Sequence, residues 1–312
     1  MKFYQKTFAL LGLGMGLSVP ALADDLDVLG QFLEQNYILP KETPNIDFIR
    51  TNPEELLEAQ AAIAGPLLVS QSALITNDKT GEILYQKNMH RIMPIASISK
   101  LMSAMVVLDA DLDMNEPVTI TEAEIDRLKG TGSRLSIGTT LTRAQLLHLS
   151  LMSSENRATH ALGRTYPGGM EAFVAAMNQK AQSLGMSSSR FYEPTGLDYR
   201  NVSTASDLVK LVAAANKYPR IRRDSTSNYG SVYTSVGKMQ NYRNSNALVR
   251  EGGWEIDLQK TGYIRESGRS MVVKAKVGSQ PVTIVLLNSP SSTTRVNDAR
   301  RIQTWMLLQR PS

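Results

Sequence analysis

Near the end of the sequence, three strand-like runs follow one another with almost no chain between them: EIDLQKTGYI, RSMVVKAKVG and QPVTIVLLNS. Strands joined by so few residues pair antiparallel, because a parallel pair needs a crossover of about a dozen residues or more. Two further strands are predicted near the start, where apolar runs flank the turn signal Asn77–Gly81. The meander and this early hairpin together predict one antiparallel sheet built from both ends of the chain.

The sequence between these strands is mostly helical in pattern. Helix starts at Thr142 and Thr204 and a stop at Gly185 delimit helices in RAQLLHLSLM, TASDLVKLVAAANKY and GGMEAFVAAMNQKAQSLG. A last amphipathic helix, NDARRIQTWMLL, follows the meander. We therefore expect one main domain over residues 67–312, with a mostly helical subdomain inserted at roughly 110–245.

The first 23 residues have the pattern of a secretory signal peptide: two lysines, an apolar stretch and the small-residue motif Ala21-Leu22-Ala23. A membrane anchor is the alternative, but the apolar stretch is short and ends at Pro20. Residues 24–66 are acidic and punctuated by Pro and Asn, with a short helix predicted in NPEELLEAQAAIAG. We expect an exported protein that starts near Asp24, carries this extension and has no membrane anchor after cleavage.

Composition excludes several kinds of site. Without its signal peptide the chain has only about three more basic than acidic residues, so no nucleic-acid partner is predicted. It has no cysteine, which excludes disulfides, thiol catalysis and thiolate metal sites. His90, His148 and His160 show no metal-ligand spacing, and we expect all three to be structural. No metal and no cofactor is predicted.

The stretch PIASISKLMSAMVVLDA places Ser97 and Lys100 one helical turn apart at the head of an apolar helix. A fully buried lysine is costly unless it has a partner. The residues alone leave two interpretations. Either the serine caps the helix while the lysine extends to solvent along its aliphatic stem, or a site uses both side chains.

Two more short signals follow in order, Ser154-Glu155-Asn156 after a helix and Lys260-Thr261-Gly262 on a late strand. Each is weak alone, since Ser154 and Asn156 could simply cap neighbouring backbone. All three signals, in this order, resemble the penicillin-recognising active-site serine family of DD-peptidases and serine β-lactamases. From about Leu67 onward the chain is most similar to low-molecular-mass DD-peptidases, above all to the soluble periplasmic D-alanyl-D-alanine endopeptidases, as in FYEPTGLDYRNVSTASDLVKL.

The resemblance implies an α+β fold of the β-lactamase/transpeptidase type, with helices on both faces of the antiparallel sheet. It also implies acyl-enzyme chemistry without a cofactor, on peptidoglycan stem peptides and crosslinks in the periplasm, with penicillins as covalent inhibitors. Ser97 would attack the carbonyl of a D-alanyl bond. Lys100 would be its base if burial, the helix N-terminus and the second cation Lys260 keep it neutral. Ser154 would relay a proton to the leaving amine.

The remaining roles concern substrate binding and are likewise implied by the resemblance. Lys260 would hold Ser154, and Asn156 would bind the peptide carbonyl beside the scissile bond. The backbone N–H groups of Ser97 and of Tyr263, which follows Gly262, would form an oxyanion hole. The substrate carboxylate would be bound by Thr261 and Arg295, although an arginine beside a helix is often only solvated.

Three alternatives remain open from the sequence. A class A-type β-lactamase would need a glutamate that activates the deacylating water, and Glu193 lies at a suitable distance along the chain. A DD-carboxypeptidase would remove terminal D-alanine instead of cleaving crosslinks. A non-enzymatic sensor of β-lactams or muropeptides is the third, although it would normally carry a transmembrane segment or partner domain.

Overall fold

The strands predicted from the two ends of the chain form one five-stranded antiparallel sheet in the order β2-β1-β11-β10-β9. The computed structural model describes residues 65–309. The bounds of these strands are β1 (Ser72–Asn77), β2 (Ile83–Lys87), β9 (Glu255–Ile264), β10 (Gly268–Val277) and β11 (Gln280–Ser289). The pairing of β1 with β11 joins the start of the domain to its end, as predicted. The predicted signal peptide, the extension as far as residue 64 and its short helix lie outside the described residues.

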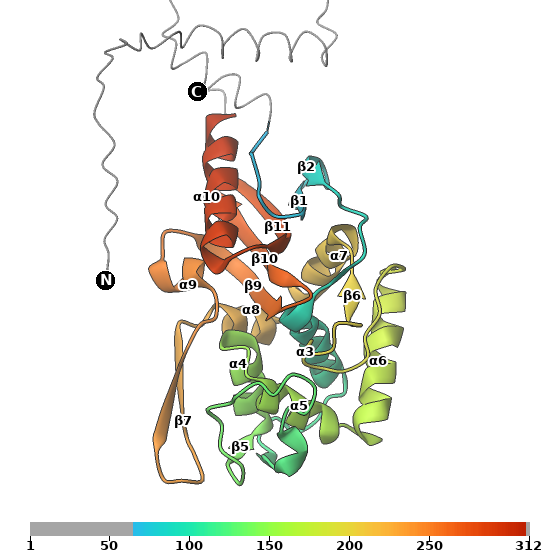
Figure 1. Ribbon diagram of the computed structural model, residues 1–312, viewed down its shortest axis with the longest axis vertical. Helices are drawn as coiled ribbons and strands as arrows, with labels where there is room; N and C mark the ends of the chain where they lie inside the picture. The colour runs from blue at the N-terminus through green and yellow to red at the C-terminus, as the bar shows by residue number, and fades with distance from the viewer. Residues whose placement is uncertain (1–64, 310–312) are drawn as a thin grey trace, which may run out of the picture. The chain divides into compact units, whose positions relative to one another are not determined.

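Helices cover both faces of this sheet, which confirms the predicted α+β fold (Figure 1). Side chains alternate between two cores: Val272 and Val285 face one, and Val273 and Ile284 face the other. The helix α10 (Ser292–Leu308) packs against β10 and β11 on the second face. On the first face lie α3 (Ser99–Asp109), α7 (Ala205–Ala215) and α8 (Pro219–Thr226), the last against the edge strand β9.

The chain between α3 and β9 holds further helices and most of the strands of three small two-stranded sheets, while one of these strands, β3, precedes α3. The helical elements are η2 (Glu122–Glu124), α4 (Arg143–Met152), α5 (Asn156–Arg164), α6 (Gly169–Ser183) and α9 (Ala247–Glu251). The small sheets pair β3 (Met93–Pro94) with β6 (Val202–Ser203), β4 (Pro117–Thr119) with β5 (Thr140–Thr142), and β7 (Tyr229–Tyr233) with β8 (Met239–Arg243). Because α7 packs on β1, β10 and β11, part of the segment 110–245 belongs to the sheet layer. The limits of an inserted subdomain therefore stay a prediction.

The predicted helix ends are confirmed by their hydrogen bonds. Thr142 accepts from the N–H of Gln145, whose side chain bonds back to Thr142, and Thr204 accepts from the N–H of Asp207. Gly185 follows α6 with a φ of +68°, a left-handed conformation that glycine adopts at little cost. These caps fix where α4, α6 and α7 begin or stop.

Two of the three histidines, His148 and His160, pair with acidic side chains. His160 Nδ1 lies 3.2 Å from Glu124 Oε1, and His148 Nδ1 lies 3.5 Å from Asp224 Oδ1. Within residues 65–309 no cluster of three or more potential metal ligands occurs. The same part of the chain contains no helix that combines the length and apolarity needed to span a membrane.

Candidate active site

Ser97 and Lys100 lie where a 3₁₀ turn, η1 (Ala96–Ile98), leads into α3. Ser97 makes no capping bond, so its hydroxyl is available. The amine of Lys100 donates to Ser97 Oγ over 2.8 Å, to Asn156 Oδ1 over 2.8 Å and to the carbonyl of Thr195 over 2.7 Å. Lys100 is fully buried. The interpretation of a capping serine with a lysine that extends to solvent is therefore wrong.

Burial has a direct effect on the chemistry of Lys100. It disfavours the charged ammonium and lowers the pKa of Lys100 to about 7, against the opposing charges of Glu193 and Glu155. A substantial fraction of the side chain is then a neutral amine near neutral pH. Such an amine, in contact with a serine hydroxyl, can accept its proton.

A second lysine–serine pair lies in the same site. Lys260 on β9 donates to Ser154 Oγ over 2.9 Å and to the carbonyl of Thr261 over 2.9 Å, and it is also fully buried. Burial lowers its pKa well below the ordinary value, and the positive charges of Lys100 and Arg295 lower it further. The cap of α5 is Glu155, so Ser154 and Asn156 are not the capping residues that the sequence left as an alternative.

The backbone around these serines adopts unusual conformations. Ala96 and Ser154 have φ values of +48° and +64°, in the left-handed region that costs energy for residues other than glycine. Gly262 on β9 approaches η1 so closely that a Cβ atom there would lie 2.8 Å from Ile95 O and 3.1 Å from Ser97 N. A tight strand–turn contact therefore positions the nucleophile beside β9.

The loop after α6 contacts Lys100, and the carboxylate of Glu193 stabilises this loop. One carboxylate oxygen accepts from the N–H of Thr195 over 2.7 Å and from its hydroxyl over 2.6 Å. The other accepts from the N–H groups of Gly196 over 2.5 Å and Asp198 over 3.3 Å. Glu193 is thus bonded within its own loop, and that loop supplies the Thr195 carbonyl that binds Lys100.

Arg295 is buried rather than merely solvated, with 5% of its surface exposed. It donates to the carbonyl of Ser270, which pairs with Gly262 across the β9–β10 ladder. Burial lowers the pKa of Arg295 to about 10, and the neighbouring Arg269 and Arg250 contribute. Tyr263 is half exposed, with the guanidinium of Arg269 over its ring.

The predicted site residues therefore fall into an inner group and an outer group. Hydrogen bonds link Ser97, Lys100 and Asn156 in one network and Ser154, Lys260 and Thr261 in another. Gly262 lies against η1. Tyr263 is the next residue along β9, and Arg295 lies on α10, behind β9. Sequence reasoning missed Ser245, which accepts from Thr261 Oγ1 over 2.8 Å, and the Thr195 carbonyl, because neither belongs to a motif.

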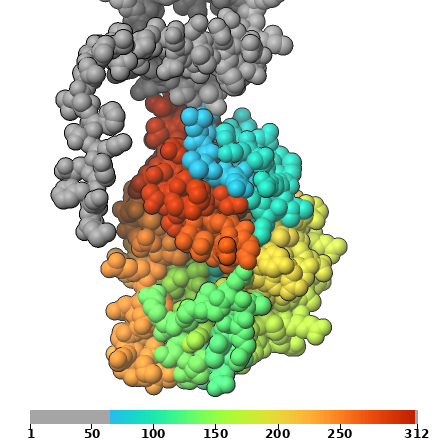
Figure 2. Space-filling model, viewed as in Figure 1, coloured from blue at the N-terminus to red at the C-terminus, as the bar shows by residue number. Residues whose placement is uncertain are grey.

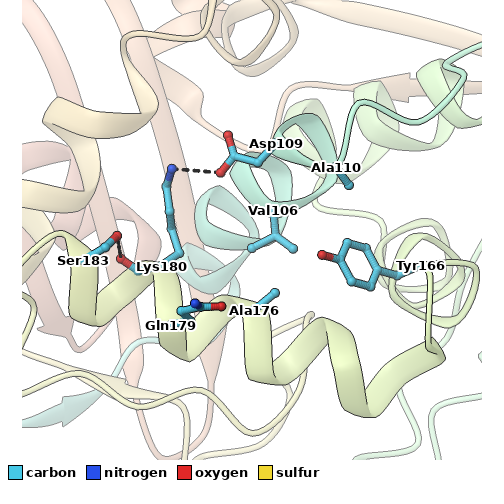
Figure 3. Close-up of a pocket in the computed structure, with 8 residues that line it drawn as sticks. All are labelled: Val106, Asp109, Ala110, Tyr166, Ala176, Gln179, Lys180 and Ser183. Carbon is cyan, nitrogen blue, oxygen red and sulfur yellow. Dashed lines mark hydrogen bonds and ion pairs between the residues drawn. The ribbon is translucent and has the colours of Figure 1, made fainter.

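A hollow of about 410 Å³ opens beside these networks, lined by Gly132–Arg134 and Ser153–Asn156. It gives a bound molecule access to Ser154 and Asn156. A different hollow lies between α3 and α6, where Asp109 and Lys180 form an ion pair of 2.8 Å (Figure 3). That hollow is at the far end of α3 from Ser97, about 18 Å along the helix, and it contributes nothing to the serine site.

The arrangement resembles known proteins in sequence and in structure. Residues 59–291 match the D-alanyl-D-alanine carboxypeptidase family, peptidase S11. The chain is 42% identical over 240 residues to the D-alanyl-D-alanine endopeptidase of Pseudomonas aeruginosa, covering 77% of each chain. It is 40% identical over 257 residues to the D-alanyl-D-alanine endopeptidase of Escherichia coli, covering 81% of this chain and 83% of that one.

Among solved structures, the Streptomyces K15 DD-transpeptidase superposes with a TM-score of 0.72 at 27% identity, over 78% of this chain and 98% of its own. The sequence match covers most of the chain and includes every predicted site residue except Arg295. The two lysine–serine pairs lie within the matched residues. The chain therefore belongs to the D-alanyl-D-alanine carboxypeptidase family, peptidase S11.

Proposed function

We propose that this chain is a serine DD-peptidase that hydrolyses D-alanyl bonds in peptidoglycan crosslinks through an acyl-enzyme on Ser97. The observation that carries the proposal is the fully buried Lys100 amine, 2.8 Å from Ser97 Oγ and with a pKa lowered to about 7. An amine that ionises near working pH is suited to act as a general base.

In the proposed acylation step, neutral Lys100 takes the hydroxyl proton while Ser97 Oγ bonds to the D-alanyl carbonyl carbon. The backbone N–H groups of Ser97 and Tyr263 stabilise the oxyanion. Ser154, held by Lys260, donates a proton to the leaving amine as the peptide bond breaks. Water then hydrolyses the ester and returns the enzyme to its starting state.

Substrate binding is proposed to use the remaining polar groups. Asn156 binds the peptide carbonyl with its amide, while its Oδ1 holds Lys100 in place. Thr261 and Arg295 bind the substrate carboxylate, with Arg295 acting from behind β9. The cluster of Arg295, Arg269 and Arg250 gives this end of the site a positive potential that favours an anionic group.

Crosslink cleavage is favoured over the alternatives by two observations. The relatives with 40–42% identity are named endopeptidases, whereas those named carboxypeptidases have 25–29% identity. A β-lactamase needs a carboxylate free to activate water, and Glu193 has both oxygens bonded to its own loop.

The test compares two soluble substrates, a crosslinked muropeptide dimer and a pentapeptide monomer, with products resolved by chromatography. We expect the dimer to be cleaved faster, and Ser97→Ala to abolish both reactions and the covalent adduct with labelled penicillin. Faster release of terminal D-alanine would make the enzyme a carboxypeptidase. Rapid penicillin turnover without a detectable adduct would make it a β-lactamase.

We further propose that the protein acts in the periplasm after removal of residues 1–23. The signal-peptide pattern of the sequence supports this location. The check is N-terminal sequencing of protein from a soluble periplasmic fraction, which should start near Asp24. Recovery only from detergent extracts with residues 1–23 intact would contradict the proposal.

A further inference from the structure

The hairpin of β7 and β8 presents an exposed face with a distinct composition. Side chains alternate along it, so that Val232 and Tyr242 are buried while the other face points outward. The outward face consists of three cross-strand pairs: Tyr229–Arg243, Ser231–Asn241 and Tyr233–Met239. Tyr229 is 64% exposed and Tyr233 is 68% exposed. In Figure 2 the hairpin, in orange, forms the lower left edge of the molecule beside the green segment before α4.

This hairpin is fixed along its length. A two-stranded hairpin alone is marginally stable in water. Here Arg134 donates to the carbonyl of Asn241 over 3.0 Å and places its guanidinium 4.4 Å from the Tyr242 ring centre. Near the tip, Ser235 donates through its N–H to Thr139 Oγ1 over 3.0 Å and through its hydroxyl to the carbonyl of Ile137 over 2.7 Å. The inner face is thereby held, and the outer face is a preorganised surface.

The chemistry of the outer face matches a carbohydrate chain. Tyr229 and Tyr233 are four residues apart on one strand, so their Cα atoms lie about 13 Å apart along it. This distance is enough to span more than one sugar ring. Tyrosine offers a flat apolar ring and a polar hydroxyl, which suit the apolar face and the hydroxyl rim of a sugar. Ser231 and Asn241 between the rings supply hydrogen-bonding groups.

Hydrogen-bonding groups and position point to one particular carbohydrate. Arg243 lies over the Tyr229 ring at 5.8 Å and offers N–H donors to the amide carbonyl and hydroxyl oxygens of a sugar chain that bears peptides. The strand β8 leads directly into Ser245, which accepts the hydrogen bond of Thr261 in the candidate active site. A polymer that carries its peptides into that site would therefore pass beside the hairpin.

We propose that the outer face of the β7–β8 hairpin binds the glycan strands of peptidoglycan, with sugar rings stacked on Tyr229 and Tyr233. The proposal rests on the proposed function, since it concerns the glycan part of the same substrate. It assigns the hairpin a role in retaining the polymer while the serine site cleaves its crosslinks.

The binding test uses the mature protein with Ser97→Ala and glycan strands freed of peptides by an amidase, measured by co-sedimentation or fluorescence anisotropy. Replacing both Tyr229 and Tyr233 by Ala should weaken binding about tenfold or more, because two stacking surfaces are lost. Replacing both by Phe should retain most of the binding, since the rings remain. Tyr199→Ala, which removes a tyrosine 54% exposed outside the hairpin, is the matched control and should bind normally.

A second measurement separates this inference from the proposed function. With Ser97 intact, the double Ala variant should be acylated by penicillin and should cleave a soluble muropeptide dimer as the parent protein does, but digest intact sacculi more slowly. Failure of the parent protein to cleave the dimer would contradict the proposed function alone. Failure of the parent to bind glycan, or equal glycan binding by the double Ala variant, would overturn the glycan surface. Tyrosine-dependent binding to anionic phospholipid vesicles without glycan binding would overturn it in favour of a membrane contact.

Discussion

Burial gives Lys100 a property that surface lysines lack. If its neutral amine activates Ser97, Lys100→Ala should lower the rate of acylation by labelled penicillin by about 10²- to 10⁴-fold. Lys100→Arg should do no better, because a guanidinium stays protonated and cannot accept the hydroxyl proton. The matched control is Lys180→Ala, which breaks the ion pair with Asp109 at the far end of α3 and should leave acylation normal. Normal acylation in Lys100→Ala would refute the mechanism.

The same side chain makes both rate and stability depend on pH. Acylation should fall as pH drops through about 7, where Lys100 becomes protonated. For stability the sign follows from proton binding: the folded pKa lies below the ordinary value of 10.5, so the unfolded chain binds the proton more tightly between about 7 and 10.5. The free energy of unfolding should therefore increase as pH rises from about 7 to 10.5, and this contribution of Lys100 is lost as pH falls through about 7. Lys100→Ala should flatten the rise, as measured by melting temperature.

Two adjacent serines offer a direct test of the second pair. Ser154 Oγ accepts a hydrogen bond from the Lys260 amine, whereas Ser153 Oγ donates one to the carbonyl of Leu149 in α4. Ser154→Ala should reduce peptide cleavage by about 10²-fold or more if its hydroxyl carries the proton to the leaving amine. Ser153→Ala should cleave normally and lose only a little stability. Equal activity of the two variants would remove Ser154 from the mechanism.

At the scale of secondary-structure elements, the contact of β9 with η1 sets the nucleophile's position. In Gly262→Ala the new Cβ would lie 2.8 Å from Ile95 O, so β9 and η1 must separate by some tenths of an ångström. We expect a marked fall in acylation rate with folding retained, because small misplacements of reacting groups are costly. Gly81→Ala, in the turn between β1 and β2, is the control: its Cβ would meet no atom within 4 Å, and its φ of +75° should cost some stability without lowering the acylation rate. Rates and melting temperatures of both variants are the measurements.

The elements that the sequence could predict are those with local signals. The five strands of the main sheet and the caps at Thr142 and Thr204 follow from periodicity and from residue preferences at helix ends. The β7–β8 hairpin could not be predicted, because its strands alternate polar residues with Tyr and Val and have no strong apolar pattern. The 3₁₀ turn at Ser97 also escaped prediction, since Ala96 adopts a left-handed conformation that only the packing of Gly262 and Gly196 against it explains.

The candidate site could be predicted only in part for a similar reason. The motifs identify Ser97, Lys100, Ser154 and Lys260, and the resemblance assigns their roles. Contacts made by backbone groups, such as the Thr195 carbonyl on Lys100, leave no residue-specific signal in a sequence. The bonds of Glu193 within its loop could not be read either, and they are what weakens the β-lactamase alternative.

At the scale of the whole molecule, one buried carboxylate ties the start of the domain to its last helix. Asp298 on α10 accepts from the N–H groups of Val69 over 3.1 Å and Ser70 over 2.8 Å, and from the Ser70 hydroxyl over 2.6 Å. It is fully buried and also bonds Arg301. These hydrogen bonds hold the segment before β1 against α10, the helix that follows β11. They lie on the face of the sheet opposite Ser97.

This carboxylate should matter for stability and not for chemistry. Asp298→Ala leaves buried donors unpaired and should cost about 3 kcal/mol, seen as a melting temperature several degrees lower. Asp298→Asn keeps one acceptor oxygen and should lose less. Asp257→Ala, which removes an exposed carboxylate from β9, is the matched control and should melt like the parent protein. Well below the melting temperature, penicillin acylation of Asp298→Ala should be nearly unchanged, because η1 and α3 lie on the opposite face of the sheet from α10. A large loss of acylation with an unchanged melting temperature would instead couple Asp298 to the site, through Arg295 one turn away on α10.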